Sequence, residues 1–182
     1  MGNGYDIPPP PEKRVSDPGS FRGIAIEGVE KSFGPKNVLS GTDLLIHKGE
    51  TIVIIGRSGE GKSVLLKHIV RLLDPDKGRI WVEGTEISQL EDKPLMKLRR
   101  KFGFLFQGAA LFDSMNISKN VGIMLEEHSG WPEDKIHARA SECLAMVGLD
   151  DAENKAPSEL SGGMKKRAGL ARAIVMEPEY IL

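Results

Sequence analysis

The sequence predicts an α/β fold organised around one strand, one turn and one helix. Residues 52–55 are all β-branched, an apolar run typical of a strand buried on both faces of a sheet. A glycine-rich turn follows at 56–63, and the apolar residues after it recur at helical spacing. β-type segments precede this unit and mostly helical patterns follow it. The chain therefore mixes strands and helices around one central turn.

The turn matches a phosphate-binding loop. It reads G-x-x-x-x-G-K-S, and its glycines let successive backbone N–H groups point inward around a polyphosphate. We expect Lys62 to place a charge on the terminal phosphates, Ser63 to give its hydroxyl to Mg²⁺, and the following helix to direct its positive end at the anion. The alternative is a glycine-rich turn that binds nothing. The residues expected to hold the nucleotide are Gly56, Arg57, Ser58, Gly59, Glu60, Gly61, Lys62 and Ser63.

Composition narrows the class of protein. At 182 residues, with 40% hydrophobic and 28% charged residues, the chain has the balance of one globular domain. A formal net charge of −1 argues against a nucleic-acid-binding protein, whose domain would be basic. We therefore expect no nucleic-acid partner.

Cysteine, histidine and hydropathy patterns exclude other classes. The single cysteine, Cys143, is expected to be a small buried residue on a helix, and it leaves no disulfide framework. The four histidines lack neighbours at metal-ligand spacing, which predicts no zinc site. No apolar run approaches the roughly 18 residues of a membrane span, and the N-terminus lacks a secretory pattern. These patterns favour a cytosolic protein.

The order of elements follows from proline, glycine and periodicity. Residues 1–20 are rich in proline and poor in large apolar groups, so we expect a disordered tail before the fold begins. The later helical pattern is interrupted by Ser-Gly-Trp-Pro at 129–132. The pattern predicts strands near 24–29, 38–46, 79–84 and 102–107, a short basic helix at 94–101, and helices from 117 to 148.

A second motif precedes the last helix. Residues 157–163 lead into a helix whose apolar positions repeat from Met164 onward, with Ser161 as its expected N-cap. Three cations, Lys-Lys-Arg at 165–167, fall in its first turn, where they oppose the helix dipole. Local rules tend to be broken at functional sites.

Three features together resemble the ATP-binding subunit of ABC transporters: the loop at 56–63, Gln107 after an aromatic strand, and Leu-Ser-Gly-Gly at 160–163. The resemblance covers residues 21–182. It implies a phosphate-loop NTPase of the ABC type, with an α/β ATPase core, an antiparallel β subdomain and a helical subdomain over about residues 108–160. ATP and Mg²⁺ are the implied cofactors.

The resemblance also implies residue roles. Gln107 would touch Mg²⁺ together with Ser63 and sense the membrane partner. Phe33 would stack on adenine, although a core phenylalanine at a strand end is the alternative. A homodimer that encloses ATP follows from the second motif. Its residues, which would contact the γ-phosphate held by the opposite subunit, are Ser161, Gly162 and Gly163.

A narrower resemblance concerns the cargo. The segment 106–116, and the Met-Lys-Lys-Arg that follows the double glycine, look like the ATPases of MCE-type (Mla-like) lipid transporters. This implies phospholipid transport through an integral-membrane permease, with the chain on the cytoplasmic face of the inner membrane. A generic transporter ATPase is the alternative, and the sequence specifies neither the lipid nor the direction of transport.

The chain departs from the family pattern at its end. The family places a Mg²⁺-binding Asp and a catalytic Glu shortly after the last helix, whereas this sequence stops at Leu182. We therefore expect a C-terminally truncated cassette, nominate no catalytic residue, and predict that the 182-residue chain alone is inactive.

Two other functions compete with transport. An ABC-type, nucleotide-gated clamp is the first, but repair clamps carry a long coiled coil between the two motifs, and Ser161 lies only 98 positions after Ser63 (161 − 63). A phosphate-loop kinase or GTPase is the second. A GTPase needs a guanine-reading Asn-Lys-x-Asp, and the nearest run, 154–157, lacks the Asp.

Overall fold

The computed structural model describes residues 17–182. The chain divides into two compact units, Met1–Leu95 and Met96–Leu182, called here the N-terminal unit and the C-terminal unit. Most of the tail that we expected to be disordered lies outside the described residues. Residues 17–20 form a turn in which the amide of Ser20 donates to the carbonyl of Asp17 at 3.2 Å.

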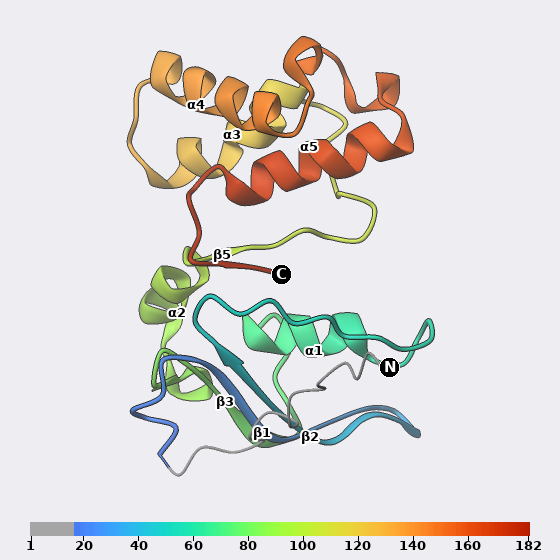
Figure 1. The fold of residues 1–182 in the computed structure, drawn as a ribbon, viewed down its shortest axis with the longest axis vertical. Helices are drawn as coiled ribbons and strands as arrows, with labels where there is room; N and C mark the ends of the chain where they lie inside the picture. The colour runs from blue at the N-terminus through green and yellow to red at the C-terminus, as the bar shows by residue number, and fades with distance from the viewer. Residues whose placement is uncertain (1–16) are drawn as a thin grey trace, which may run out of the picture. The chain divides into compact units, whose positions relative to one another are not determined.

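A four-stranded antiparallel sheet forms the N-terminal unit (Figure 1), with the strand order β2-β1-β3-β4. Its long hairpin pairs Ile24 with Ile46 and ends where Phe33 pairs with Lys36. The apolar side of these strands forms the core, and Ile24 is fully buried. The three strands predicted near 24–29, 38–46 and 79–84 are confirmed. The elements are β1 (Gly23–Phe33), β2 (Lys36–His47), β3 (Lys77–Val82), β4 (Thr85–Glu86) and the 3₁₀ helix η1 (Ile87–Gln89).

Helix α1 (Lys62–Ile69) lies over one face of this sheet (Figure 1), with Leu65 and Ile69 buried against it. Helix α2 (Asp92–Arg99) confirms the predicted basic helix, and along the chain it runs from one unit into the other.

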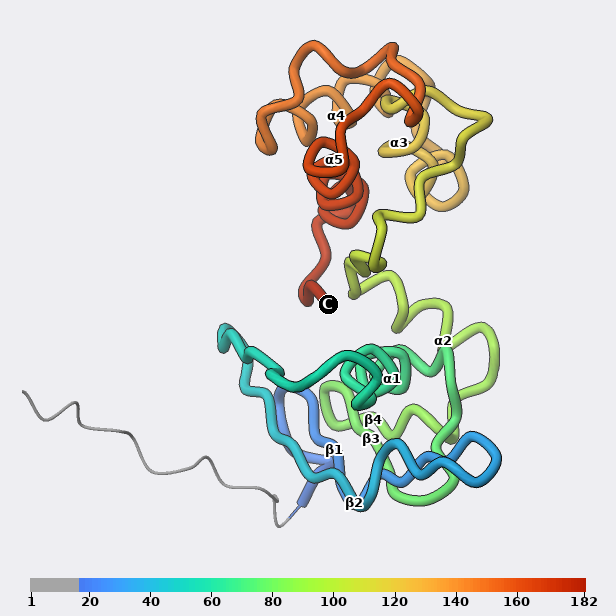
Figure 2. The backbone as a smooth tube through the Cα atoms, turned by 90° about the vertical axis from the view of Figure 1, so that its right-hand side faces the viewer, coloured from blue at the N-terminus to red at the C-terminus, as the bar shows by residue number. Residues whose placement is uncertain are grey.

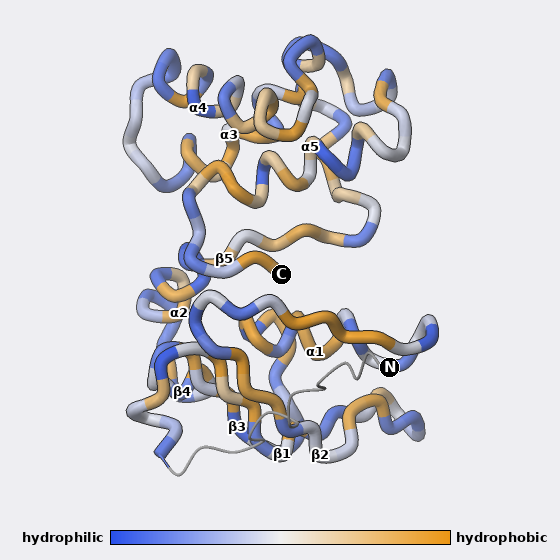
Figure 3. The backbone as a smooth tube through the Cα atoms, viewed as in Figure 1, coloured by the Kyte–Doolittle hydropathy of each residue, from blue (hydrophilic) through white to orange (hydrophobic). Residues whose placement is uncertain are grey.

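The strand expected at 52–55 does not form in the structure. This stretch is extended but pairs with no strand among the described residues, and it is not buried on both faces, since Val53 is 75% exposed and Ile55 is 90% exposed. Figure 3 shows the segment before α1 as strongly hydrophobic. A β-strand requires a neighbour for its N–H and C=O groups, so an apolar, β-branched sequence does not make a strand by itself.

Three helices build the C-terminal unit: α3 (Ile117–His128), α4 (Glu133–Met146) and α5 (Gly162–Ile174). Figure 2 shows α5 nearly end on, with α3 and α4 packed beside it. Asn116 caps α3 by accepting from the amide of Lys119 at 2.9 Å. The interruption predicted at 129–132 separates α3 from α4. Two 3₁₀ helices, η2 (Asp150–Ala152) and η3 (Pro157–Glu159), precede α5.

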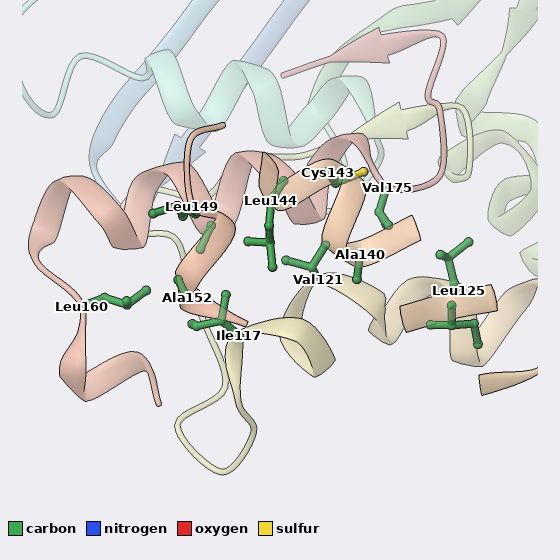
Figure 4. Close-up of a cluster of buried hydrophobic side chains, with 13 residues drawn as sticks. Ile117, Val121, Leu125, Ala140, Cys143, Leu144, Leu149, Ala152, Leu160 and Val175 are labelled. Carbon is green, nitrogen blue, oxygen red and sulfur yellow. The ribbon is translucent and has the colours of Figure 1, made fainter. Parts of the chain in front are cut away.

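The apolar faces of these helices meet in one cluster of buried side chains (Figure 4). Val121 of α3, Leu144 of α4 and Ala171 of α5 are fully buried in it. Cys143 belongs to the same cluster, as expected of a small buried residue, and burial raises the pKa of its thiol. The cluster holds the starts of α3 and α5 in a defined geometry.

A short parallel pair completes the C-terminal unit. Strand β5 (Phe102–Gly103) pairs with β6 (Tyr180–Ile181), and the ladder continues as the amide of Leu105 donates to the carbonyl of Leu182 at 2.8 Å. The strand predicted at 102–107 is thus shorter than expected. Its polar end, Gln107, lies in the turn beyond the ladder. None of the described helices is both long and apolar enough to cross a membrane.

Candidate functional site

The loop at 56–63 is shaped by two glycines in the left-handed region. Gly59 has φ 82°, and Gly61, which directly precedes α1, has φ 92°. A Cβ on Gly61 would lie 2.8 Å from Cγ1 of Val38 and 2.9 Å from its carbonyl oxygen. Only glycine fits this close approach between the loop and β2. No side chain caps α1, so its first N–H groups stay available to a ligand.

The loop already binds an anion from its own chain. Oε2 of Glu60 accepts from the amide of Arg57 at 2.6 Å. Nζ of Lys62 donates to the carbonyl of Gly56 at 2.8 Å and to that of Arg57 at 2.6 Å. The carboxylate of Glu60 and the ammonium group of Lys62 thus both bind backbone groups of the loop. The amide of Arg57, the ammonium group of Lys62 and the exposed hydroxyl of Ser63 are groups of the type that binds a polyphosphate with Mg²⁺.

Phe33 lies on a hairpin beside this loop. The hairpin pairs Phe33 with Lys36, whose Nζ approaches the carbonyl of Gly59 at 3.5 Å. Phe33 is 46% exposed, and Nζ of Lys31 lies 5.8 Å from its ring centroid. The alternative in which Phe33 is a core residue is wrong for this structure. The aromatic face is available for stacking.

Gln107 lies in an unusual turn in the C-terminal unit. The next three residues are all left-handed: Gly108 (φ 82°), Ala109 (φ 68°) and Ala110 (φ 46°). This conformation costs a non-glycine residue roughly 1–2 kcal/mol. Two guanidinium N–H groups of Arg172 donate to the carbonyls of Ala109 and Ala110. The turn is therefore held by α5.

An apolar cavity of about 480 Å³ adjoins this turn within the C-terminal unit. We call it the aromatic pocket. The aromatic run at 102–106 was the available sequence signal for it, but we did not predict a pocket there. Its lining is largely apolar, and its charged residues are the cations Arg99, Arg100 and Arg172 and the carboxylate Glu127. The apolar lining includes Phe102, Phe104, Phe106, Phe112, Ile123, Met124 and Met176.

The second motif forms the N-terminus of α5. Oγ of Ser161 accepts from the amide of Met164 at 3.3 Å, which confirms the predicted N-cap. Gly162 and Gly163 are exposed, and a Cβ at either would meet nothing within 4 Å. Arg167 donates to the carbonyls of Val147 and Gly148 at 2.9 and 2.7 Å. It thus caps the C-terminal end of α4, which explains one of the three cations in the first turn of α5.

The structure groups the predicted residues by unit. Phe33 and the loop at 56–63 belong to the N-terminal unit, whereas Gln107 and residues 161–163 belong to the C-terminal unit. Among the described residues, no cluster of His, Cys, Asp and Glu side chains could by itself hold a metal ion.

A glycine-rich loop that leads into a helix beginning with a lysine and a serine is the pattern of a phosphate-loop nucleotide-binding protein. The family described as ABC transporter matches residues 39–182, and the chain belongs to this family. Members of this family bind and hydrolyse ATP, and their cassettes work as dimers with membrane permeases. The fold is accordingly that of an ABC ATPase cassette.

Known proteins similar to this chain agree on the family. A probable ribonucleotide transport ATP-binding protein, mkl, of Mycobacterium bovis is 46% identical over 173 residues, covering 94% of this chain and 48% of the relative. The chloroplastic protein trigalactosyldiacylglycerol 3 of Arabidopsis thaliana is 45% identical over 167 residues, covering 87% of this chain and 48% of the relative. The chain thus spans about half the length of these curated relatives.

A solved structure supports the same fold. A dimeric ATP-binding cassette in a post-hydrolysis state, bound to ADP and Pi, is 32% identical with a TM-score of 0.80. The match covers 87% of this chain and 72% of that cassette.

Proposed function

We propose that this chain binds Mg-ATP as part of the ATP-binding subunit of an ABC transporter that moves phospholipid. The observation that carries nucleotide binding is the loop at 56–63, where a carboxylate occupies the amide of Arg57 beside Lys62. ATP would displace Glu60 from that amide, and Lys62 would turn from the carbonyls to the phosphates. Phe33 would stack on adenine from the adjacent hairpin.

Mg²⁺ and a second subunit complete the proposed site. Ser63 and Gln107 would offer oxygen atoms to the metal, the ligand type that Mg²⁺ prefers. Ser161, Gly162 and Gly163 would contact the γ-phosphate held by another copy of the chain. The open space around Gly162 and Gly163 supports this role, because a phosphate can approach their backbone directly. The expected assembly is a homodimer across ATP.

The lining of the aromatic pocket is an argument for a permease partner. Its apolar lining and its cations suit an amphipathic segment with acidic residues, and it lies beside the turn that carries Gln107. We propose that a cytoplasmic segment of an integral-membrane permease docks there. This would place the chain at the cytoplasmic face of the inner membrane.

Phospholipid is the cargo that the sequence favours. The Met-Lys-Lys-Arg after the double glycine and the segment 106–116 resemble the ATPases of MCE-type lipid transporters. The name of the Arabidopsis relative refers to a glycerolipid, whereas that of the mycobacterial relative refers to ribonucleotide transport. The two cargoes are separable in vesicles. Phospholipid should stimulate ATP hydrolysis by the complete transporter and ribonucleotides should not, and the reverse result would contradict a lipid cargo.

Hydrolysis is proposed for the complete ATPase and not for the 182 residues alone. Phosphoryl transfer needs an anchored metal and an oriented water, and no carboxylate of this chain matches the family's Asp and Glu for these roles. Losing one such group commonly lowers the rate about 10²- to 10³-fold. Phosphate release by the 182-residue chain would be compared with release by a protein extended through the family's next strand. Equal rates would contradict this proposal.

The alternative function is that of an ABC-type ATPase that acts as a nucleotide-gated clamp and takes no part in transport. It shares the ATP site and the dimer, but it has no use for a permease pocket. Co-purification with a membrane permease separates the two functions. A complex that forms with the parent protein and is lost in Phe104→Asp would favour the transporter, and no complex at all would favour the clamp.

The direct test of nucleotide binding uses two lysines of α1. Lys62→Ala removes the ammonium group from the loop, and Lys67→Ala removes one from the last turn of the same helix. Binding of a fluorescent ATP analogue with Mg²⁺ should weaken at least tenfold in the first variant and remain within about twofold in the second. Equal affinities in both variants would show that the loop does not hold the phosphates.

A further inference from the structure

The turn after Gln107 is left-handed along three successive residues, two of which are strained. Gly108 takes a positive φ without cost, but the Cβ atoms of Ala109 and Ala110 crowd the backbone in this conformation. Such strain persists only where the surroundings hold it. Gln107 is exposed and its side chain has no hydrogen-bond partner in the described part of the chain, so the turn positions the backbone from which this side chain extends.

One side chain of α5 binds the strained residues directly. Nη1 of Arg172 donates to the carbonyl of Ala110 at 2.8 Å, and Nη2 donates to the neighbouring carbonyl of Ala109. A guanidinium group presents two parallel donors, and two successive left-handed residues present two neighbouring acceptors. Burial lowers the pKa of Arg172, and its hydrogen-bond acceptors are carbonyls, not carboxylates. The guanidinium group of Arg172 thus uses two of its donors to bind this turn.

Two further contacts secure the same segment. Oδ1 of the fully buried Asn120 accepts from the amide of Phe112 at 2.7 Å, and its Nδ2 donates to the carbonyl of Phe112 at 3.0 Å. On α5, Gly169 makes room for the turn, because a Cβ there would lie 2.9 Å from the Cβ of Ala109. Helices α3 and α5 therefore hold the segment from two directions.

We propose that Arg172 is a positioning residue that keeps the turn after Gln107 in its left-handed form, assisted by Asn120 and Gly169. This inference rests on the proposed role of Gln107 at the Mg²⁺ ion. Arg172 also lines the aromatic pocket. A segment that docks in the pocket would therefore contact the same guanidinium group that holds Gln107 in place.

The test compares two arginines of α5 in the 182-residue chain. Arg172→Met removes both donors from the turn. Arg167→Met is the matched control, since Arg167 also donates to two neighbouring carbonyls but at the end of α4. Hydrogen–deuterium exchange at the amides of residues 109–112 should become about tenfold faster in Arg172→Met and stay unchanged in Arg167→Met. Far-ultraviolet circular dichroism checks that both variants remain folded.

Two more variants distinguish positioning from general stability. Ala110→Gly in the Arg172→Met background should bring exchange at 109–112 back toward the parent rate, because glycine adopts the positive φ without strain. If Arg172→Met does not fold, Arg172→Lys keeps the charge but loses the two-donor fork, and it should show the same local change to a smaller extent.

Equal exchange in the Arg172 and Arg167 variants, or no recovery with glycine at position 110, would overturn the proposal. Failure of the parent chain to bind ATP would instead contradict the proposed function. It would leave the exchange result intact, so the two failures are distinguishable.

Discussion

The starts of α1 and α5 are both glycine-rich helix N-termini, yet their surroundings differ. At α1, the loop is filled by its own side chains: Glu60 binds the amide of Arg57, and Lys62 binds two loop carbonyls. At α5, the space around Gly162 and Gly163 is open. Under the proposed function, the loop before α1 is a nucleotide site that its own charged side chains fill in the absence of ligand, and the open start of α5 is part of the interface with a second subunit.

Capping shows the same contrast. Ser161 satisfies one amide at the start of α5 with its own hydroxyl, whereas α1 has no side-chain cap. The uncapped helix keeps its donors for a ligand. The N-cap of α5 satisfies one donor without a ligand, and under the proposed function the phosphate would come from the opposite subunit. Substitutions at the two helix starts, and one at the hairpin of Phe33, test this comparison, from the largest expected effect to the smallest.

We expect the largest difference between Gly61→Ala and Gly163→Ala, measured as the change in the free energy of unfolding. At Gly61, a methyl group would meet Val38 at 2.8 Å in a left-handed backbone, so the free energy of unfolding of the N-terminal unit should fall by about 2–4 kcal/mol. At Gly163, nothing lies within 4 Å, and alanine should stabilise α5 by up to about 1 kcal/mol. Urea denaturation of the two variants measures both. Similar losses would show that the two helix starts do not differ in packing.

Gly162→Asp tests whether α5 presents an interface. The monomer has room for the side chain, so ATP affinity should not change, but a carboxylate would repel the γ-phosphate of the opposite subunit. Light scattering with Mg-ATP should show dimers for the parent chain and at least tenfold weaker dimerisation for the variant. Gly162→Ala, which adds a methyl group but no charge, separates charge repulsion from the loss of open space at the same position. Normal dimerisation of Gly162→Asp would contradict the assignment of this motif.

Glu60→Gln tests whether the carboxylate of Glu60 competes with ATP for the amide of Arg57. The amide side chain keeps the length of glutamate but loses the charge that competes for the amide of Arg57. ATP should then bind about fivefold more tightly, since a charge-assisted hydrogen bond no longer has to be broken. Isothermal titration at constant Mg²⁺ measures the change. Weaker binding would mean that Glu60 assists the nucleotide and does not compete with it.

Asp76→Asn should have the smallest effect and reports on the hairpin of Phe33. The hydrogen bond from Lys31, followed by that from the amide of Ser32, lowers the pKa of Asp76. A carboxyl group with a lowered folded-state pKa stabilises the fold above its unfolded-state pKa, and that contribution disappears as the pH falls through the folded-state value. Asp76→Asn should therefore melt below the parent at neutral pH, and the difference should vanish in strong acid. A difference that persists in acid would exclude the ion pair as its cause.

The sequence predicted secondary-structure elements well where the residues of one segment are enough to indicate the element. The alternation in β1, β2 and β3, the N-cap at Ser161 and the break between α3 and α4 all follow from neighbouring residues. The prediction of a buried strand at residues 52–55 failed, because a strand forms there only if a neighbouring strand pairs with it, and the sequence pattern does not show whether one does. The sequence pattern also missed Arg172 and Asn120, which act on segments distant in sequence.

By itself, the sequence determined the phosphate-loop pattern, the family, and the residue types available for phosphate and metal. These depend on short motifs whose backbone needs are local, such as a glycine at a positive φ. Only the tertiary structure decided that Glu60 occupies the loop, that Phe33 is exposed beside it, and that Arg172 holds the turn after Gln107. Side-chain hydrogen bonds extend over a few ångströms of space and do not depend on separation along the chain, so packing alone selects their partners.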